Sequence, residues 1–222
     1  MAAPIDPAAL PAEIAVFPLS GALLLPEGRL PLNIFEPRYL AMTEDSLAAG
    51  RMFGMIQPDP AAPREATGPG LYRIGCLGRL TSFAETEDGR FLITLTGMIR
   101  FRVAEELEMR RGYRRVRADY APFQTDLESG AAEAVDRPAL LGALRPFFKA
   151  RGIEANWDAI EQTSDRMLVL TLAMVCPFEV PEKQALLEAA TPSDRAAMLI
   201  ALLQMGVHGT ASADAPPGRR PS

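Results

Sequence analysis

Residues 98–103 read Met-Ile-Arg-Phe-Arg-Val, and this stretch decides the class of fold. Ile99, Phe101 and Val103 alternate with two arginines, which is the period of two that a half-buried β-strand produces. The alternation predicts that the three apolar side chains face a protein core and that both arginines point away from it. We therefore expect β-structure in this half of the chain.

The period of two extends to either side of this strand, from residue 14 to residue 120. Asp88-Gly89 separates two alternating segments, and this dipeptide favours the positive φ angles of a tight hairpin turn. Gly75 and Gly78 interrupt a further apolar segment. They predict bends or bulges, which a strongly coiled sheet requires.

Helical patterns occur once within the strand region and then through most of the remaining chain. Pro37 suits the first turn of a helix, and Thr191 with Asp194 resembles a capping box at the start of another. We expect helices at residues 36–47, 134–151, 156–175 with a break near Thr163, 182–190 and 192–205.

These patterns predict an α+β fold with two structured parts between two tails. The tails are rich in Ala, Pro and Gly and carry too little apolar mass to offset the entropy of ordering. The predicted division is a flexible tail at 1–12, a β-rich subdomain with one helix at 13–123, a helical bundle at 124–208 that begins with a polar linker, and a disordered tail at 209–222.

The charge and cysteine content narrow the classes of function. The net charge of −5 argues against a globally basic nucleic-acid binder. Cys76 and Cys176 cannot form a disulfide framework, and their apolar neighbours predict buried packing residues. The N-terminus lacks a signal-peptide pattern, and the apolar stretch at 167–176 is about half of what a bilayer requires. We expect a cytoplasmic protein with no membrane segment.

The residues that enzymes use are scarce in this chain. Gly70 and Gly75 have phosphate-loop spacing, but the required lysine and hydroxyl residue do not follow them. His208 is the single histidine, and Lys149 and Lys183 are the two lysines, both in polar helical contexts with no serine in an elbow motif nearby. We expect no catalytic residues, no metal site and no cofactor, and therefore a protein that is not an enzyme.

Arginines gather in the last strands of the β-rich part and leave two interpretations open. A groove for phosphates or acidic peptides would use them together with the aromatic rings of Phe101 and Tyr113. Alternatively, they lie on exposed strand faces and pair with the interleaved glutamates, which we favour. The seven are Arg100, Arg102, Arg110, Arg111, Arg114, Arg115 and Arg117.

Two apolar features also have two interpretations. Three consecutive leucines at 23–25 lie in a connection between strands, where they either cap the sheet core or line a groove for extended peptides. Met42, Met52 and Met55 either fill gaps in a core or form one side of an adaptable binding surface.

Several short motifs, taken in order, resemble the N-terminal substrate-binding domain of Lon proteases. The resemblance spans about residues 13–205, and the order of the motifs makes it specific. They are Phe17-Pro18-Leu19, Leu24-Leu25-Pro26-Glu27-Gly28, the segment from Leu30 to Tyr39 that ends Phe35-Glu36-Pro37-Arg38-Tyr39, Phe53-Gly54-Met55-Ile56, Ile74-Gly75-Cys76-Leu77, Asp88-Gly89-Arg90, the segment from Gly97 to Val103, and Glu182-Lys183-Gln184-Ala185-Leu186-Leu187-Glu188 followed by Arg195.

The resemblance implies a PUA-like β-barrel-type subdomain followed by a small helical bundle. In Lon proteases this domain helps to capture unfolded substrates, ahead of an ATPase module and a Ser-Lys peptidase module. Neither module has its motifs in this sequence, so we expect a stand-alone bacterial form.

We therefore predict a non-catalytic polypeptide-binding module that acts as an adaptor or regulator of proteolysis. Its partners would be unfolded or extended polypeptide segments, together with a protease or chaperone. The alternative is an RNA-binding PUA-like protein that uses the arginines between residues 100 and 117. The expected polypeptide contacts are Leu24, Leu25, Pro26, Phe35, Arg38, Tyr39 and Met42.

Overall fold

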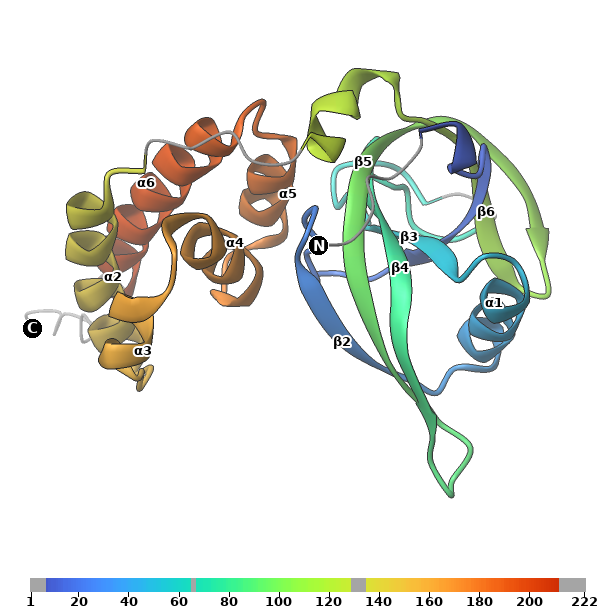
Figure 1. The fold of residues 1–222 in the computed structure, drawn as a ribbon, viewed down its shortest axis with the longest axis horizontal. Helices are drawn as coiled ribbons and strands as arrows, with labels where there is room; N and C mark the ends of the chain where they lie inside the picture. The colour runs from blue at the N-terminus through green and yellow to red at the C-terminus, as the bar shows by residue number, and fades with distance from the viewer. Residues whose placement is uncertain (1–6, 65–66, 129–134, 212–222) are drawn as a thin grey trace, which may run out of the picture. The chain divides into compact units, whose positions relative to one another are not determined.

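The computed structural model describes residues 7–64, 67–128 and 135–211 (Figure 1). Six strands and the first helix precede the remaining helices, which confirms the α+β class. The elements are η1 (Pro7–Ala9), β1 (Glu13–Pro18), β2 (Arg29–Ile34), α1 (Pro37–Ala48), β3 (Met52–Ile56), β4 (Ile74–Glu85), β5 (Phe91–Arg110), β6 (Tyr113–Asp119), η2 (Ala121–Leu127), α2 (Arg137–Arg151), α3 (Trp157–Gln162), α4 (Asp165–Val175), α5 (Val180–Glu188) and α6 (Pro192–Ala211).

The chain forms two compact units. The first, here called the strand unit, contains all six strands, α1 and, from the later part of the chain, α5; the second contains α2, α3, α4 and α6. This differs from the predicted bundle at 124–208 because α5 packs with the strands. Lys183 donates a hydrogen bond to the Gly21 carbonyl, and Gln184 donates one to the Ile74 carbonyl.

Two other predicted segments also differ from the structure. The polar linker predicted at the start of the 124–208 bundle, over residues 124–133, begins within η2, and residues 129–133 lie outside the described part of the chain. The predicted tail at 209–222 overlaps the end of α6, while residues 1–6 and 212–222 lie outside the description.

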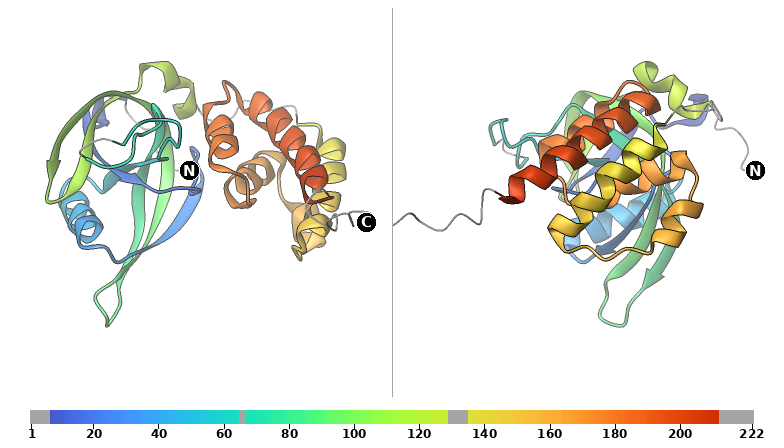
Figure 2. Two further views of the ribbon diagram at one scale, coloured as in Figure 1. Left: turned by 180° about the vertical axis from the view of Figure 1, so that it is seen from behind. Right: turned by 90° about the vertical axis from the view of Figure 1, so that its left-hand side faces the viewer.

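The six strands form one sheet whose pairings close a ring. Their order is β2-β5-β4-β3-β1-β6, and β6 also pairs with β5. The ring therefore contains β5, β4, β3, β1 and β6, and β2 pairs with the first residues of β5, on the edge that β6 pairs with farther along the strand. The pairing of β1 with β3 is parallel, and the others are antiparallel. The sheet is thus barrel-type with an extra strand, and the β4–β5 hairpin projects beyond it (Figure 2).

The long strand β5 supplies much of the core. Ile99 and Phe101 are fully buried and Val103 is nearly so, as their alternation predicts. The expectation that the arginines lie on exposed strand faces is wrong for one of the two that intervene. Arg100 is only 3% exposed, because Asp126 from η2 covers it, whereas the Arg102 side chain is half-exposed.

Glycines shape the strands as the sequence indicates. Gly89 has φ of 76° in the predicted hairpin turn. The register between β4 and β5 shifts at Leu77/Gly78, which is the predicted irregularity. Gly75 lies against the Met55 carbonyl and the Phe101 ring, so the phosphate-loop spacing reflects close strand packing.

Leucines 23–25 cap the sheet core. Leu24 contacts the sheet beside Gly78, and the Leu25 carbonyl lies against Gly97. All three leucine side chains are at most 2% exposed, so the groove interpretation is wrong. The methionine surface is wrong for the same reason, since Met42 and Met55 are buried.

In the second unit, the helix ends follow the predicted local chemistry. A break at Thr163 separates α3 from α4, as expected. The Thr191 hydroxyl accepts from the Asp194 backbone N–H, and the Asp194 carboxylate accepts from the Thr191 backbone N–H, which confirms the capping box at α6.

Replacing Gly97 with alanine tests the packing of the 23–25 connection. An alanine Cβ would lie 2.0 Å from the Leu25 carbonyl oxygen, so backbone must move. We expect Gly97→Ala to lower the free energy of unfolding by about 3 kcal/mol or more in urea denaturation. Gly89→Ala is the control, because open space surrounds Gly89 and only its positive φ is strained, at about 1 kcal/mol. Equal losses in the two variants would contradict the packing described.

Candidate functional site

A small pocket lies in the strand unit where the start of α1 meets the turn between β5 and β6. Its volume is about 100 Å³, which is enough for one side chain of a ligand but not for a nucleotide. Prolines and tyrosines make up much of its wall, so its lining is rigid. The lining residues are Pro18, Arg38, Tyr39, Pro58, Thr67, Pro69, Gly112, Tyr113 and Arg114.

The first wall of the pocket comes from α1. Pro37 occupies the first turn of the helix, as predicted, and places Arg38 and Tyr39 at its start. The Tyr39 ring packs against Phe17 of β1 with centroids 4.1 Å apart. The Arg38 guanidinium lies 4.6 Å from the Tyr39 ring centroid and pairs with Glu36 at 2.7 Å. Burial raises the pKa of Tyr39, so its hydroxyl stays neutral.

The opposite wall comes from a tight turn. Arg111 and Gly112 both have positive φ, at 47° and 84°, which lets β5 and β6 join through two residues. Gly112 can adopt this conformation without strain, whereas Arg111 is an uncommon residue there. The turn brings Tyr113 to the pocket.

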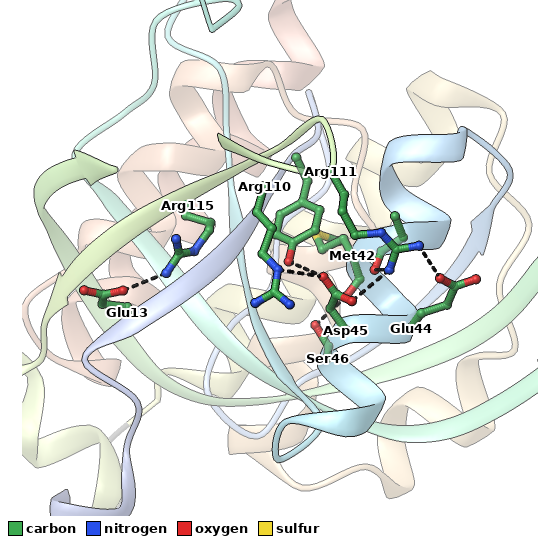
Figure 3. A network of polar contacts seen from close by, with 10 residues as sticks. Glu13, Met42, Glu44, Asp45, Ser46, Arg110, Arg111 and Arg115 are labelled. Carbon is green, nitrogen blue, oxygen red and sulfur yellow. Dashed lines mark hydrogen bonds and ion pairs between the residues drawn. The ribbon is translucent and has the colours of Figure 1, made fainter. Parts of the chain in front are cut away.

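Ion pairs and a hydrogen bond fasten this turn to α1 (Figure 3). The Asp45 carboxylate accepts from the Tyr113 hydroxyl at 2.7 Å and from Arg111 Nη1 at 2.8 Å, and Arg110 Nε lies 3.3 Å from it. Arg111 Nη2 also pairs with Glu44 at 2.7 Å. The two pocket walls are therefore held together by charged contacts around Asp45.

These contacts shift the pKa values of Asp45 and Tyr113 in opposite directions. The hydrogen bond from Tyr113, together with Arg111 and Arg110, holds the pKa of Asp45 below its ordinary value of 3.8. Burial and the same hydrogen bond raise the pKa of Tyr113 to about 12. Asp45 is therefore an anion and Tyr113 a neutral donor at neutral pH.

Arg114 closes the base of the pocket with its charge already compensated. Its side chain is 6% exposed and donates to both carboxylate oxygens of Glu106, at 2.7 and 2.6 Å. It also donates to the Pro69 carbonyl at 2.6 Å. Burial would raise the pKa of Glu106, but the hydrogen bonds and charge of Arg114 outweigh it and lower that pKa.

All seven arginines of the basic stretch have a carboxylate within 4.0 Å. Pairing with acidic residues is thus what the structure shows, and the Phe101 ring is buried in the core where no base could stack on it. The pairs are Arg100 with Asp126, Arg102 with Asp119, Arg110 with Asp45, Arg111 with Glu44 and Asp45, Arg114 with Glu106, Arg115 with Glu13, and Arg117 with Glu13 and Glu105.

The structure does not bring the seven predicted contact residues into one site. Arg38 and Tyr39 line the pocket, and Phe35, just before α1, is 62% exposed. Pro26 is partly exposed in its turn. The remaining three, Leu24, Leu25 and Met42, are at most 1% exposed and serve as packing residues.

Sequence reasoning missed most of the pocket because its lining comes from separate segments. Pro18, Pro58 and Pro69 are far from α1 in sequence, and only the fold brings them to Arg38. Gly112 between two alternating segments was the available signal, since a glycine there permits the hairpin turn that places Tyr113.

The described residues contain no group of three His, Cys, Asp or Glu side chains that could hold a metal ion. Cys76 and Cys176 are both buried, as predicted, and they do not form a disulfide with each other. Lys183 was expected in a polar context, but it is 7% exposed and donates to the Gly21 carbonyl at 2.6 Å. Among the helices described, none has the length and apolar character needed to cross a membrane.

Comparison with known proteins places the chain in a family. Residues 13–205 match the family described as the ATP-dependent protease La (LON) substrate-binding domain. The chain belongs to this family. The match confirms the resemblance drawn from the order of the motifs, and it covers the substrate-binding domain without the ATPase or peptidase modules.

Full-length Lon proteases are among its relatives. The chain is 25% identical to Lon protease 2 of Myxococcus xanthus over 57% of its own length and 15% of that protein. It is 23% identical to Lon protease 1 of Herpetosiphon aurantiacus over 86% of its length and 24% of that protein. The chain therefore spans less than a quarter of the curated relatives described.

Solved structures show the same fold. The Lon N-terminal domain protein from Xanthomonas campestris superposes with a TM-score of 0.57 and 23% identity, covering 85% of this chain and 97% of that one. The N-terminal domain of the Mycobacterium avium complex Lon protease gives a TM-score of 0.55 at 17% identity, covering 86% and 97%.

Replacing Asp45 with asparagine tests the clamp between the pocket walls. At neutral pH we expect Asp45→Asn to lower the free energy of unfolding by about 1–2 kcal/mol, because two arginines and Tyr113 lose a charged acceptor. Because the pKa of Asp45 in the folded state lies below its ordinary value of 3.8, the ionised carboxylate stabilises the fold at pH values above 3.8. This stabilisation is lost as the pH falls through the folded-state pKa.

Urea denaturation at a series of pH values measures this difference between Asp45→Asn and the natural protein. It should shrink as the pH falls below 3.8. Glu44→Gln is the control, since that half-exposed pair should contribute at most about 0.5 kcal/mol. A difference that does not depend on pH would show that the Asp45 charge has no role.

Proposed function

We propose that this protein is a non-catalytic module that binds unfolded or extended polypeptide segments. The observation that carries the proposal is the family match, which covers residues 13–205 and comprises the substrate-binding domain alone. The described residues add a pocket without catalytic groups, whose charged side chains are already paired. Such a surface suits reversible binding of another chain.

The proposed contact surface lies around the start of α1. Phe35 offers an exposed aromatic ring, and Arg38 with Tyr39 forms one wall of the pocket. Pro26 remains a proposed contact. Covering an aromatic side chain that is 62% exposed makes the free energy of binding more favourable by about 1–2 kcal/mol. Phe35 is therefore the strongest single candidate.

The pairing of the arginines supports a polypeptide ligand over RNA. Nucleic-acid affinity depends on cations that release counterions from phosphates, and an arginine held by a carboxylate contributes little to that release. Each of the seven arginines between residues 100 and 117 has such a partner. We therefore do not retain the RNA-binding alternative.

The wider role that we propose is that of an adaptor or regulator of proteolysis in the cytoplasm. A bound segment would be held for a separate protease or chaperone, because the module offers no peptidase chemistry of its own. The support is that the relatives described above are Lon proteases, of which this chain matches only a small share.

The binding proposal is tested with a labelled, permanently unfolded model protein and its folded counterpart. Fluorescence anisotropy should show saturable binding of the unfolded form and none of the folded form, without nucleotide. Phe35→Ser should weaken binding about three- to tenfold, because it removes exposed apolar area from the contact.

Val175→Ser is the matched control, since Val175 is 66% exposed on α4 in the other unit. It should bind like the natural protein. Absence of binding by the natural protein would refute the function, and equal affinities of the two variants would exclude Phe35 from the contact.

A further inference from the structure

The strand β2 has a neighbour on one side only. It pairs with β5, whereas each strand of the ring is paired on both sides over part of its length. The outer edge of β2 therefore presents backbone groups that no other described strand satisfies. An open edge is a template for an additional extended chain.

The pairing pattern identifies which backbone groups point outward. In an antiparallel pair, alternate residues bond to the partner strand and the residues between them face away. The Gly97 N–H donates to the Gly28 carbonyl, so the backbone of Gly28 faces β5. Every second residue after Gly28 faces β5 as well, and these residues are Leu30, Leu32 and Ile34. The outward-facing residues are then Arg29, Pro31 and Asn33, which agrees with Pro31 having no N–H to donate.

This edge offers five hydrogen-bonding groups to an extended guest. They are the N–H groups of Arg29 and Asn33 and the carbonyl groups of Arg29, Pro31 and Asn33. All three residues are exposed. A guest strand would use its backbone to satisfy these groups, which makes such recognition tolerant of sequence.

Apolar side chains flank the edge on both faces. Leu92 lies opposite Asn33 on β5 and is 46% exposed, and Phe35, which directly follows β2, is 62% exposed. On the other face, Leu30 and Leu32 are partly exposed. Side chains of an added strand would therefore meet apolar surface on either face, which stabilises a pairing that backbone bonds alone hold weakly.

We propose that β2 captures polypeptide segments by strand addition, with the guest lying in extended form along Arg29, Pro31 and Asn33. The proposal rests on the proposed polypeptide-binding function and specifies its mode. The ligand class is an extended segment with free backbone N–H groups and apolar side chains at alternate positions. Folded proteins are excluded because their backbone groups are already paired.

Pro31 favours such a guest over a second copy of this chain. Pro31 has no backbone N–H, so the β2 edge lacks one hydrogen-bond donor at its centre. If the β2 edges of two copies paired with each other, a carbonyl group on each strand would have no donor facing it. A guest without proline loses only one hydrogen bond. Pro31 thus keeps the edge open for a foreign segment.

The test removes one backbone donor from the edge. Asn33→Pro deletes the Asn33 N–H, which β5 does not use, whereas Asn33→Ala removes the same side chain and keeps the N–H. We expect Asn33→Pro to weaken binding of the labelled unfolded model protein about tenfold and Asn33→Ala to change it less than about twofold. Thermal unfolding of both variants checks that the fold is kept.

A second measurement uses the natural protein and does not depend on folding of the proline variant. Two versions of a short labelled peptide of alternating valine and threonine are compared. One is N-methylated at the valines and the other at the threonines. Only one of the two peptides should lose binding, because only one set of N–H groups faces β2.

Three results would overturn strand addition while leaving polypeptide binding intact. They are equal affinities of Asn33→Pro and Asn33→Ala, equal binding by the two methylated peptides, and concentration-dependent dimers that Asn33→Pro abolishes. Failure of the natural protein to bind the unfolded model protein would instead refute the proposed function.

Discussion

The strand unit depends on a buried ion pair in the middle of β5. Arg100 donates its Nε and Nη2 to the Asp126 carboxylate at 2.9 and 2.8 Å, its Nη1 to the Leu187 carbonyl, and its backbone N–H to Asp126. One side chain thereby fixes η2 and α5 against the strand. Both partners are at least nine-tenths buried, so losing either leaves an uncompensated charge at a cost of about 3–5 kcal/mol.

Local sequence patterns predicted much of the fold. The features that they missed depend on contacts between residues far apart in the chain. Period-two alternation and the turn at Gly89 gave the strands correctly, because each depends on neighbours in sequence. The burial of Arg100 depends on Asp126, which lies twenty-six positions away. The pocket likewise joins Pro18 and Arg38 with Pro69 and Arg114, and no local pattern records that meeting.

The same physics separates the predicted contact residues into two groups. Leu24, Leu25 and Met42 are apolar and lie near the motif that indicates the family, but the sheet needs them as core and buries them. Phe35 stays exposed because it follows the last residue of β2, beyond the ring. In the closed ring of β5, β4, β3, β1 and β6 each strand has two partners, whereas β2 is paired on one side only along its whole length.

Residue-resolved amide hydrogen exchange by NMR, with and without an unfolded model protein, tests this account most directly. In the free protein the Leu32 amide should be protected by its bond to β5, and the Asn33 amide should exchange rapidly. Adding the unfolded protein should slow exchange at Asn33 and leave Leu32 unchanged. An Asn33 amide that is protected in the free protein, or that exchanges as rapidly when polypeptide is bound, would contradict capture at the β2 edge.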